Sequence, residues 1–273
     1  MKSVLIVFTV TFILTMITSI IANRTVNRSL KIKEETVLSS SKPEKSTFRK
    51  GDIESLPPVV KRYFSLVLTD GQRYIESVSL QHSGTFRADL DGRWMNIRGK
   101  QVFTAGTPQF HWTGKTALFT ASDSFTGGKG ELRVYLFGSF PIVRTKGPAT
   151  DQGELLRWLG ESVWFPTNLL PSDYLHWSFI DEKRALLVFT YDDLELKYIV
   201  TFNERGEICR FETQRHMGDE GLHTWIGKVG DYRKVDGMLI PMHLEAAWVL
   251  NGKELPYARF DIEKITFEPD NFY

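Results

Sequence analysis

Cysteine is almost absent from this sequence, and its scarcity excludes one whole means of stabilisation. The 273 residues contain a single cysteine, Cys209. No disulfide can therefore form within the chain, and the fold must depend on its hydrophobic core. Cys209 lies in a strand-like run without a plausible base beside it, so we interpret it as a small buried side chain and not as a nucleophile.

Recognisable catalytic and metal-binding motifs are also missing. The 6 histidines form no His-x-His or His-Glu-x-x-His pattern, so we expect no metal ion and no cofactor. There is no Gly-x-Ser-x-Gly motif, and the Gly127-Gly-Lys-Gly run lacks the spacing and the hydroxyl residue of a phosphate loop. The sequence therefore favours a binding protein over an enzyme.

Neither sign of charge is in excess. The chain has 34 basic and 33 acidic residues and a formal net charge of +1, so nothing indicates a nucleic-acid partner. Hydrophobic residues make up 42% of the sequence and aromatic residues 13%. That composition allows a sizeable core, and the aromatic share favours sheets and apolar pockets.

Charged residues are missing altogether from residues 3–23. An apolar run of about 20 residues can cross a bilayer as a helix, so we predict that residues 1–23 form an uncleaved anchor of a single-pass protein in the cell membrane. Four cations follow this run and one lysine precedes it: Arg24, Arg28, Lys31 and Lys33, against Lys2. The positive-inside rule then favours a cytoplasmic domain, whereas the family resemblance given below favours an extracytoplasmic one.

Three parts of the chain follow from the pattern of polar and apolar residues. Residues 24–50 are polar and read as a flexible tether, and residues 51–273 read as a single globular domain. A first helix is expected to begin at Ser55 as its N-cap, and a second at Asp151. From about Ile75 the hydrophobic pattern has a period of two, interrupted by turns such as Asp91-Gly.

This pattern predicts a mainly β (α+β) fold. We expect a curved antiparallel sheet of about ten strands, half-barrel-like, packed on two helices, with an additional N-terminal transmembrane helix.

Several stretches resemble an uncharacterised bacterial family, a domain of unknown function. They are Leu56-Pro-Pro-Val-Val-Lys-Arg-Tyr, Asp151-Gln-Gly-Glu-Leu-Leu-Arg-Trp-Leu-Gly-Glu-Ser-Val-Trp-Phe-Pro-Thr, and Asp236-Gly-Met-Leu-Ile-Pro. The resemblance covers roughly Gly51 to the C-terminus. The strand order and the Asp-Gly-x-x-Ile-Pro turn are also similar to the lipoprotein-carrier fold of the LolA and LolB type. That similarity implies an apolar cavity between sheet and helices in a protein of the bacterial cell envelope.

The main polar constellation lies on the second predicted helix, where Asp151, Glu154, Arg157 and Glu161 occur within eleven positions. Arg157 and Glu161 are four residues apart and therefore neighbours on one face. They form either a structural ion pair or part of a pocket in which Arg157 meets a carboxylate or phosphate head group.

Polar and apolar residues also alternate on the same face of predicted strands, as for Gln101 with Phe103 and Arg215 with Phe211. A dry core would avoid such polar residues, so a ligand cavity is predicted. Six residues are predicted to line it: Trp112, Arg157, Glu161, Trp164, Arg215 and Trp225.

The leading functional hypothesis is a membrane-anchored module that binds a hydrophobic or amphipathic ligand of the cell envelope, such as a lipid, an acyl chain or a lipoprotein. One alternative is a hydrolase that uses carboxylates such as Asp123 and Glu161, which requires these groups to converge in a cleft. Another is an envelope assembly protein with an exposed apolar patch. The oligomeric state stays open.

Overall fold

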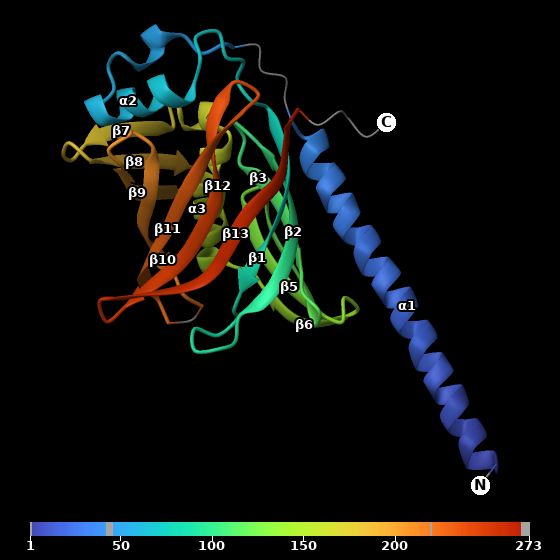
Figure 1. Ribbon diagram of the computed structural model, residues 1–273. Helices are drawn as coiled ribbons and strands as arrows, with labels where there is room; N and C mark the ends of the chain where they lie inside the picture. Colours follow the sequence, from blue (N-terminus) through green and yellow to red (C-terminus); the bar gives the residue numbers. More distant parts are fainter. Residues whose placement is uncertain (1, 42–45, 219, 269–273) are drawn as a thin grey trace.

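The computed structural model describes residues 2–41, 46–218 and 220–268, with side chains from residue 16 onward. Its centre is one antiparallel sheet of 13 strands, curved around a helix (Figure 1). The strands are β1 (Ser77–Phe86), β2 (Met95–Thr104), β3 (Gln109–Lys115), β4 (Phe119–Thr126), β5 (Lys129–Leu136), β6 (Phe140–Thr145), β7 (Leu175–Phe179), β8 (Arg184–Tyr191), β9 (Leu194–Phe202), β10 (Ile208–His216), β11 (Leu222–Val235), β12 (Met238–Leu250) and β13 (Lys253–Phe267).

The sheet consists of two meanders joined at their first and last strands. The order is β6-β5-β4-β3-β2-β1-β13-β12-β11-β10-β9-β8-β7, so β1 pairs with both β2 and β13. In the register of the joining pair, Gly84 lies opposite Phe260. Strands β6 and β7 are the two edges of an open sheet, and the chain passes from one edge to the other through α3 (Pro148–Glu161).

The predicted fold class is confirmed, but the expected number of about ten strands is too low. Strand β6 has six exposed residues and includes Pro141, so it shows no alternation of buried and exposed positions. Proline is tolerated there because an edge strand leaves some N–H groups unpaired. The other edge strand, β7, has only 5 residues, which is too short for a clear period of two.

Helix α2 (Pro58–Val67) closes one end of the curved sheet (Figure 1). It begins after Pro57, not after Ser55, and no side chain caps it. Its buried residues include Tyr63, whose ring lies 5.8 Å from that of Phe202. Three short 3-10 helices complete the set: η1 (Lys50–Ile53), η2 (Ser162–Trp164) and η3 (Pro166–Leu169).

Helix α3 lies inside the curve of the sheet and is fixed to it at several points. The Asp151 carboxylate accepts the backbone N–H of Gly130 at 2.7 Å, so Asp151 binds the sheet and caps nothing at the start of the helix. The approach is close enough that a Cβ at position 130 would lie 2.6 Å from the Thr150 carbonyl oxygen. Further along, Tyr198 donates from its hydroxyl to the Leu156 carbonyl at 3.0 Å.

Helix α1 (Lys2–Ser39) continues through residues 24–39, which the sequence assigned to a tether. This half of the helix packs on the outer face of the sheet, where Val37 and Leu38 are buried with Val102. Lys33 also pairs with Glu131 of β5 at 2.9 Å. The helix is held by tertiary contacts that its polar sequence does not reveal.

The N-terminal half of α1 extends away from the sheet (Figure 1). Within the described residues, no helix is long and apolar enough to span a membrane. Most of the anchor expected at residues 1–23 lies outside the residues whose side chains are described.

Candidate functional site

A cavity of about 580 Å³ lies between α3 and the concave face of the sheet. It exists because small residues face the helix where larger ones would fill the space: Ala121, Gly227, Ala246, Ala258 and, on α3 itself, Gly160. Aromatic and aliphatic side chains form most of the remaining wall, among them Phe86, Phe119, Val134, Val229, Leu244 and Phe260. Such mainly apolar concave sites with a few polar groups are typical of small-molecule binding.

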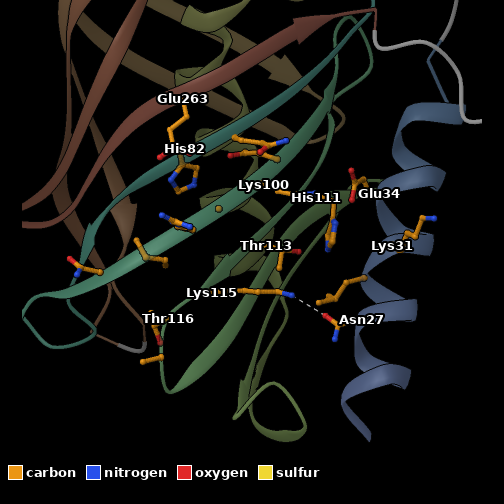
Figure 2. Close-up of a pocket in the computed structure, with 18 of the residues that line it drawn as sticks. Asn27, Lys31, Glu34, His82, Lys100, His111, Thr113, Lys115, Thr116 and Glu263 are labelled. Carbon is orange, nitrogen blue, oxygen red and sulfur yellow. Dashed lines mark hydrogen bonds between the residues drawn. The ribbon is translucent and has the colours of Figure 1, made fainter. Parts of the chain in front are cut away.

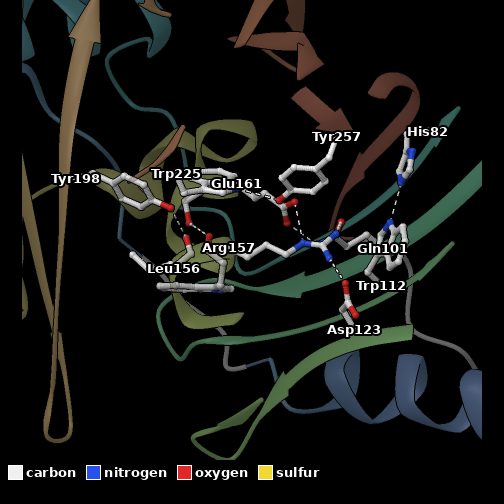
Figure 3. A network of polar contacts seen from close by, with 12 residues as sticks. His82, Gln101, Trp112, Asp123, Leu156, Arg157, Glu161, Tyr198, Trp225 and Tyr257 are labelled. Atoms are coloured by element: carbon white, nitrogen blue, oxygen red, sulfur yellow. Dashed lines mark hydrogen bonds and ion pairs between the residues drawn. The ribbon is translucent and has the colours of Figure 1, made fainter. Parts of the chain in front are cut away.

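The polar groups of the cavity gather on the side of α3, around Arg157 (Figure 3). Its guanidinium donates from Nη1 to Asp123 Oδ2 at 2.7 Å and from Nε to Glu161 Oε1 at 3.0 Å. It also lies over the Trp112 ring, 4.9 Å from the centroid. One cation therefore compensates two carboxylates, one from β4 and one from its own helix.

Gln101 of β2 completes this arrangement as a bridge (Figure 3). Its amide nitrogen donates to Glu161 Oε2 at 2.6 Å, and its amide oxygen accepts from Arg157 Nη2 at 3.3 Å. Burial raises the pKa of Glu161 and of Asp123, while Arg157 opposes that rise in both. The paired part of the cluster is a connected network in which each charge has a partner.

Two further residues with ionisable side chains line the cavity without such pairing. Glu154 is buried, and its Oε2 has no hydrogen-bond partner among the described residues. Burial, reinforced by the nearby Asp123 carboxylate, raises the pKa of Glu154 to about 8. Glu154 therefore holds its proton at neutral pH, because an isolated buried carboxylate is strongly disfavoured.

Arg215 of β10 is the second of these residues. Its guanidinium lies over the Trp225 ring at 5.6 Å and above Gly153, where a Cβ would come within 3.2 Å of Nε. No hydrogen bond or ion pair joins the Arg215 side chain to another residue in the described part of the chain. A half-buried arginine facing a cavity in this way is ready to bind an anion.

Trp112 is held in the wall by a buried histidine. Its indole N–H donates to His82 Nε2 at 2.8 Å, so the His82 ring must be neutral with its proton on Nδ1. Burial, together with the positive charge of Arg157, lowers the pKa of His82 to about 3. The His82 ring also stacks on Phe260, with centroids 4.2 Å apart.

The structure brings together five of the six residues predicted to line a cavity: Trp112, Arg157, Glu161, Arg215 and Trp225. Trp164 does not line it. Its side chain is buried in the core beside Phe103, with ring centroids 6.2 Å apart. Glu154, which belongs to the polar constellation identified on the helix, was not among the six predicted lining residues, and neither was Tyr257. The sequence indicates Glu154 only through its position three residues before Arg157, on the same face of the helix.

The cavity lies at the end of the sheet opposite α2. Its lining comes from the middle of the sheet and from the strand ends opposite α2, as for Phe86 of β1, Ile97 of β2 and Arg215 of β10. Ile142 and Val143 of β6 belong to the lining and are also exposed, so the cavity opens at this end.

Two larger hollows have a different character. One of about 790 Å³ separates α1 from β1, β2 and β3 and contains the charged side chains of Lys31, Glu34 and Lys100 (Figure 2). The other, of about 860 Å³, lies near Tyr74 and Tyr191. Both have more polar linings than the cavity beside α3, so that cavity is the better candidate for an apolar or amphipathic ligand. Among the described residues, no group of three or more His, Cys, Asp or Glu side chains is placed to hold a metal ion.

The chain belongs to DUF6544, a family of unknown function whose model matches residues 46–260. This match confirms the resemblance to an uncharacterised family. A comparison with curated proteins found no match.

Three solved structures are similar to this chain. A LolA superfamily protein from Nitrosomonas europaea has 11% identity and a TM-score of 0.43, with 76% of this chain and 91% of that chain covered. A domain proposed to be an outer membrane lipoprotein-sorting protein, from Vibrio parahaemolyticus, has 11% identity and a TM-score of 0.42, covering 71% and 86%. A DUF1329 family protein from Desulfovibrio piger has 8% identity and a TM-score of 0.40, covering 71% and 86%.

Proposed function

We propose that this protein is a membrane-anchored module that binds an amphipathic ligand with an acidic head group. The observation that carries the proposal is a cavity with apolar walls that ends at an unpaired arginine, Arg215, and an unpaired carboxyl group, Glu154. The apolar walls would hold a hydrocarbon chain, because each buried methylene contributes about 0.8 kcal/mol.

The head group would lie between Arg215 and Glu154. A carboxylate or phosphate would accept hydrogen bonds from the Arg215 guanidinium, and such charge-assisted bonds are about twice as strong as neutral ones. Glu154, which is protonated at neutral pH, would donate one more. Arg157 is less suited to this role than the sequence suggested, because Asp123 and Glu161 already compensate its charge.

Anchoring and location belong to the same proposal. Residues 1–23 would hold the protein in the cell membrane, and the globular domain from residue 51 would bind a lipid, an acyl chain or a lipoprotein at the cell envelope. The support is the uncharged run at residues 3–23. The proposal places the domain on the extracytoplasmic side, the orientation opposite to the one that the positive-inside rule favours.

A photo-reactive ligand tests the binding site. Full-length protein in lipid nanodiscs would be mixed with dodecanoate that carries a diazirine at its chain end, irradiated, and digested for peptide mapping. The label should fall on the cavity-lining segments of β11, β12 and β13. Dodecylamine with the same diazirine should label these segments several-fold less, because Arg215 repels its ammonium group.

Matched variants separate head-group binding from chain binding. Arg215→Gln should lower the labelling by dodecanoate several-fold through the head group, and Ala246→Phe should lower it by filling the cavity. The exposed Arg205→Gln and Ala117→Phe serve as controls and should label like the wild type. Equal labelling of all five proteins would contradict the proposal.

A second candidate function is acid–base hydrolysis, favoured by the convergence of Asp123, Glu154 and Glu161 in one cavity. A carboxyl group with a pKa of about 8 is suited to act as a general acid. Hydrolysis of aryl glycosides or aryl esters by the wild type, lost in Glu154→Gln and in Asp123→Asn but kept in Arg205→Gln, would support this function over simple binding.

A further inference from the structure

Large apolar side chains stand exposed at the end of the sheet where the cavity opens, and four of them come from neighbouring segments of the chain. We call them the apolar rim: Leu118, Phe137, Phe140 and Ile142, with exposed fractions of 53%, 60%, 47% and 56%. Leu118 lies in the turn between β3 and β4, and Phe137 lies in the turn between β5 and β6. Phe140 and Ile142 belong to β6. The two turns are joined, because the Phe137 N–H donates to the Leu118 carbonyl at 2.7 Å.

Phe137 adopts a backbone conformation that its side chain makes unfavourable. Its φ is +49°, in the left-handed region that bulky residues rarely enter. Asparagine or glycine would occupy this position of a turn without that cost. Neither the backbone conformation nor burial of the side chain favours phenylalanine here, so a contact outside the domain is a reasonable hypothesis for its presence.

Helix α1 touches the apolar rim at the point where its apolar half ends. The Asn23 amide donates to the Gly138 carbonyl at 3.2 Å, and the Ser139 hydroxyl donates to the Ser19 carbonyl at 3.2 Å. Just before this contact, Met16, Ile17, Ile20 and Ile21 of the helix are themselves exposed. The exposed apolar residues of the helix therefore lie next to the hairpin that carries the rim.

Positive charge follows on the other side of the same contact. Arg24 and Arg28 are exposed on the next turns of α1, and Lys115 lies beside them, donating to the Asn27 amide oxygen at 3.0 Å. Apolar groups on one level with cations directly above them match the order of acyl chains and anionic head groups at a bilayer surface.

We infer that the apolar rim inserts into the surface of the membrane that holds α1, so that the cavity opens directly onto the bilayer. The occupant of the rim is a lipid surface with anionic head groups. Ile142 belongs to both the rim and the cavity lining, so a hydrocarbon chain would pass between bilayer and cavity without crossing water. This inference rests on the proposed anchor, but not on the identity of the ligand.

An environment-sensitive fluorophore on a single cysteine tests the insertion. In full-length protein that also carries Cys209→Ser, the label would be attached through Phe137→Cys or, as a matched control, through Phe179→Cys. Phe179 is equally exposed, at 59%, but ends β7 at the α2 end of the sheet. Both proteins would be reconstituted into vesicles of phosphatidylcholine and phosphatidylglycerol that contain lipids spin-labelled in their acyl chains.

The spin-labelled lipids should quench the fluorophore at position 137 several-fold more than the one at position 179. Equal quenching of the two positions, in protein that floats with the vesicles, would overturn the insertion while leaving the anchor intact, and would make the rim a surface for a protein partner. Protein that does not float with the vesicles would overturn both the anchor and the insertion. Neither result depends on whether dodecanoate labels the cavity.

Discussion

Arg157 binds Glu161, four residues further along its own helix, at 3.0 Å, and with the same guanidinium reaches Asp123 of β4 at 2.7 Å. The sequence predicted the first contact from helical spacing alone. The second contact joins the helix to the sheet, and in it the positive charge of Arg157 compensates the carboxylate of Asp123.

Removing this cation should destabilise the protein strongly. Arg157→Leu leaves Asp123 and Glu161 in the cavity without a counter-charge, and breaking such a pair costs about 3–5 kcal/mol. Urea unfolding at pH 7 would measure the loss. Because both carboxylates can escape the penalty by taking up protons, the deficit should shrink at pH 5. A loss of the size seen for Arg205→Gln would show that solvent already screens the network.

The raised pKa of Glu154 predicts a pH dependence of stability. Its pKa is about 8 in the folded protein against an ordinary 4.5, so the folded state binds more protons between these values. The contribution of Glu154 to stability should therefore fall by about 1 kcal/mol per pH unit as the pH rises, and between about pH 6.5 and pH 8 this loss is not offset by the opposite effect of His82. Glu154→Gln, which cannot ionise, should remove this slope when unfolding is followed across that range. An unchanged slope would place the proton elsewhere in the cluster.

The buried pair of His82 and Trp112 predicts the opposite slope in acid. The pKa of His82 is lowered to about 3 by burial and by Arg157, from an ordinary value of 6.5. The unfolded state then binds more protons, so this histidine's contribution to stability is lost as the pH falls from about 6.5 to 3. His82→Phe should be less sensitive to acid than the wild type, as measured by thermal unfolding at pH 7 and pH 4. His216→Phe, in a half-buried position, is the matched control.

The attachment of α3 to the sheet should depend on the Asp151 carboxylate. Asp151→Ala leaves the buried N–H of Gly130 without its acceptor, which costs about 1–3 kcal/mol. Asp151→Asn keeps an acceptor oxygen and should lose less. Hydrogen exchange of the Gly130 amide would separate the two variants, and equal protection in all three proteins would contradict the assigned bond.

The sequence predicted the features that repeat locally. Alternation of apolar residues, as from Leu194 to Phe202, is visible without tertiary information, and so is the pairing of Arg157 with Glu161. Features that depend on distant residues were not visible. Residues 24–39 resemble a polar tether because they contain few apolar residues. Only three of them, Leu30, Val37 and Leu38, are buried.

The same limit applies within the candidate site. No local pattern distinguishes Trp164, which is packed in the core, from Trp225, which faces the cavity. Nor does the helix sequence show that Glu154 lacks a partner. The two charged residues with the largest effect on its pKa, Asp123 and Arg215, come from strands β4 and β10.

Strand β13, the last strand in the sequence, pairs with β1 in the middle of the sheet. The centre of the sheet is therefore the last part that can form. The strands β1–β6 carry Asp123, the strands β7–β13 carry Arg215, and neither set alone forms the cavity. During synthesis the edge of β1 stays open until the final strand emerges, so folding is expected to be slow and dominated by distant contacts. A chain that ends before β13 would expose the unpaired edge of β1 and lack part of the cavity lining. Such an exposed strand edge favours aggregation. The cavity beside α3 is therefore complete only when the last strand has been synthesised.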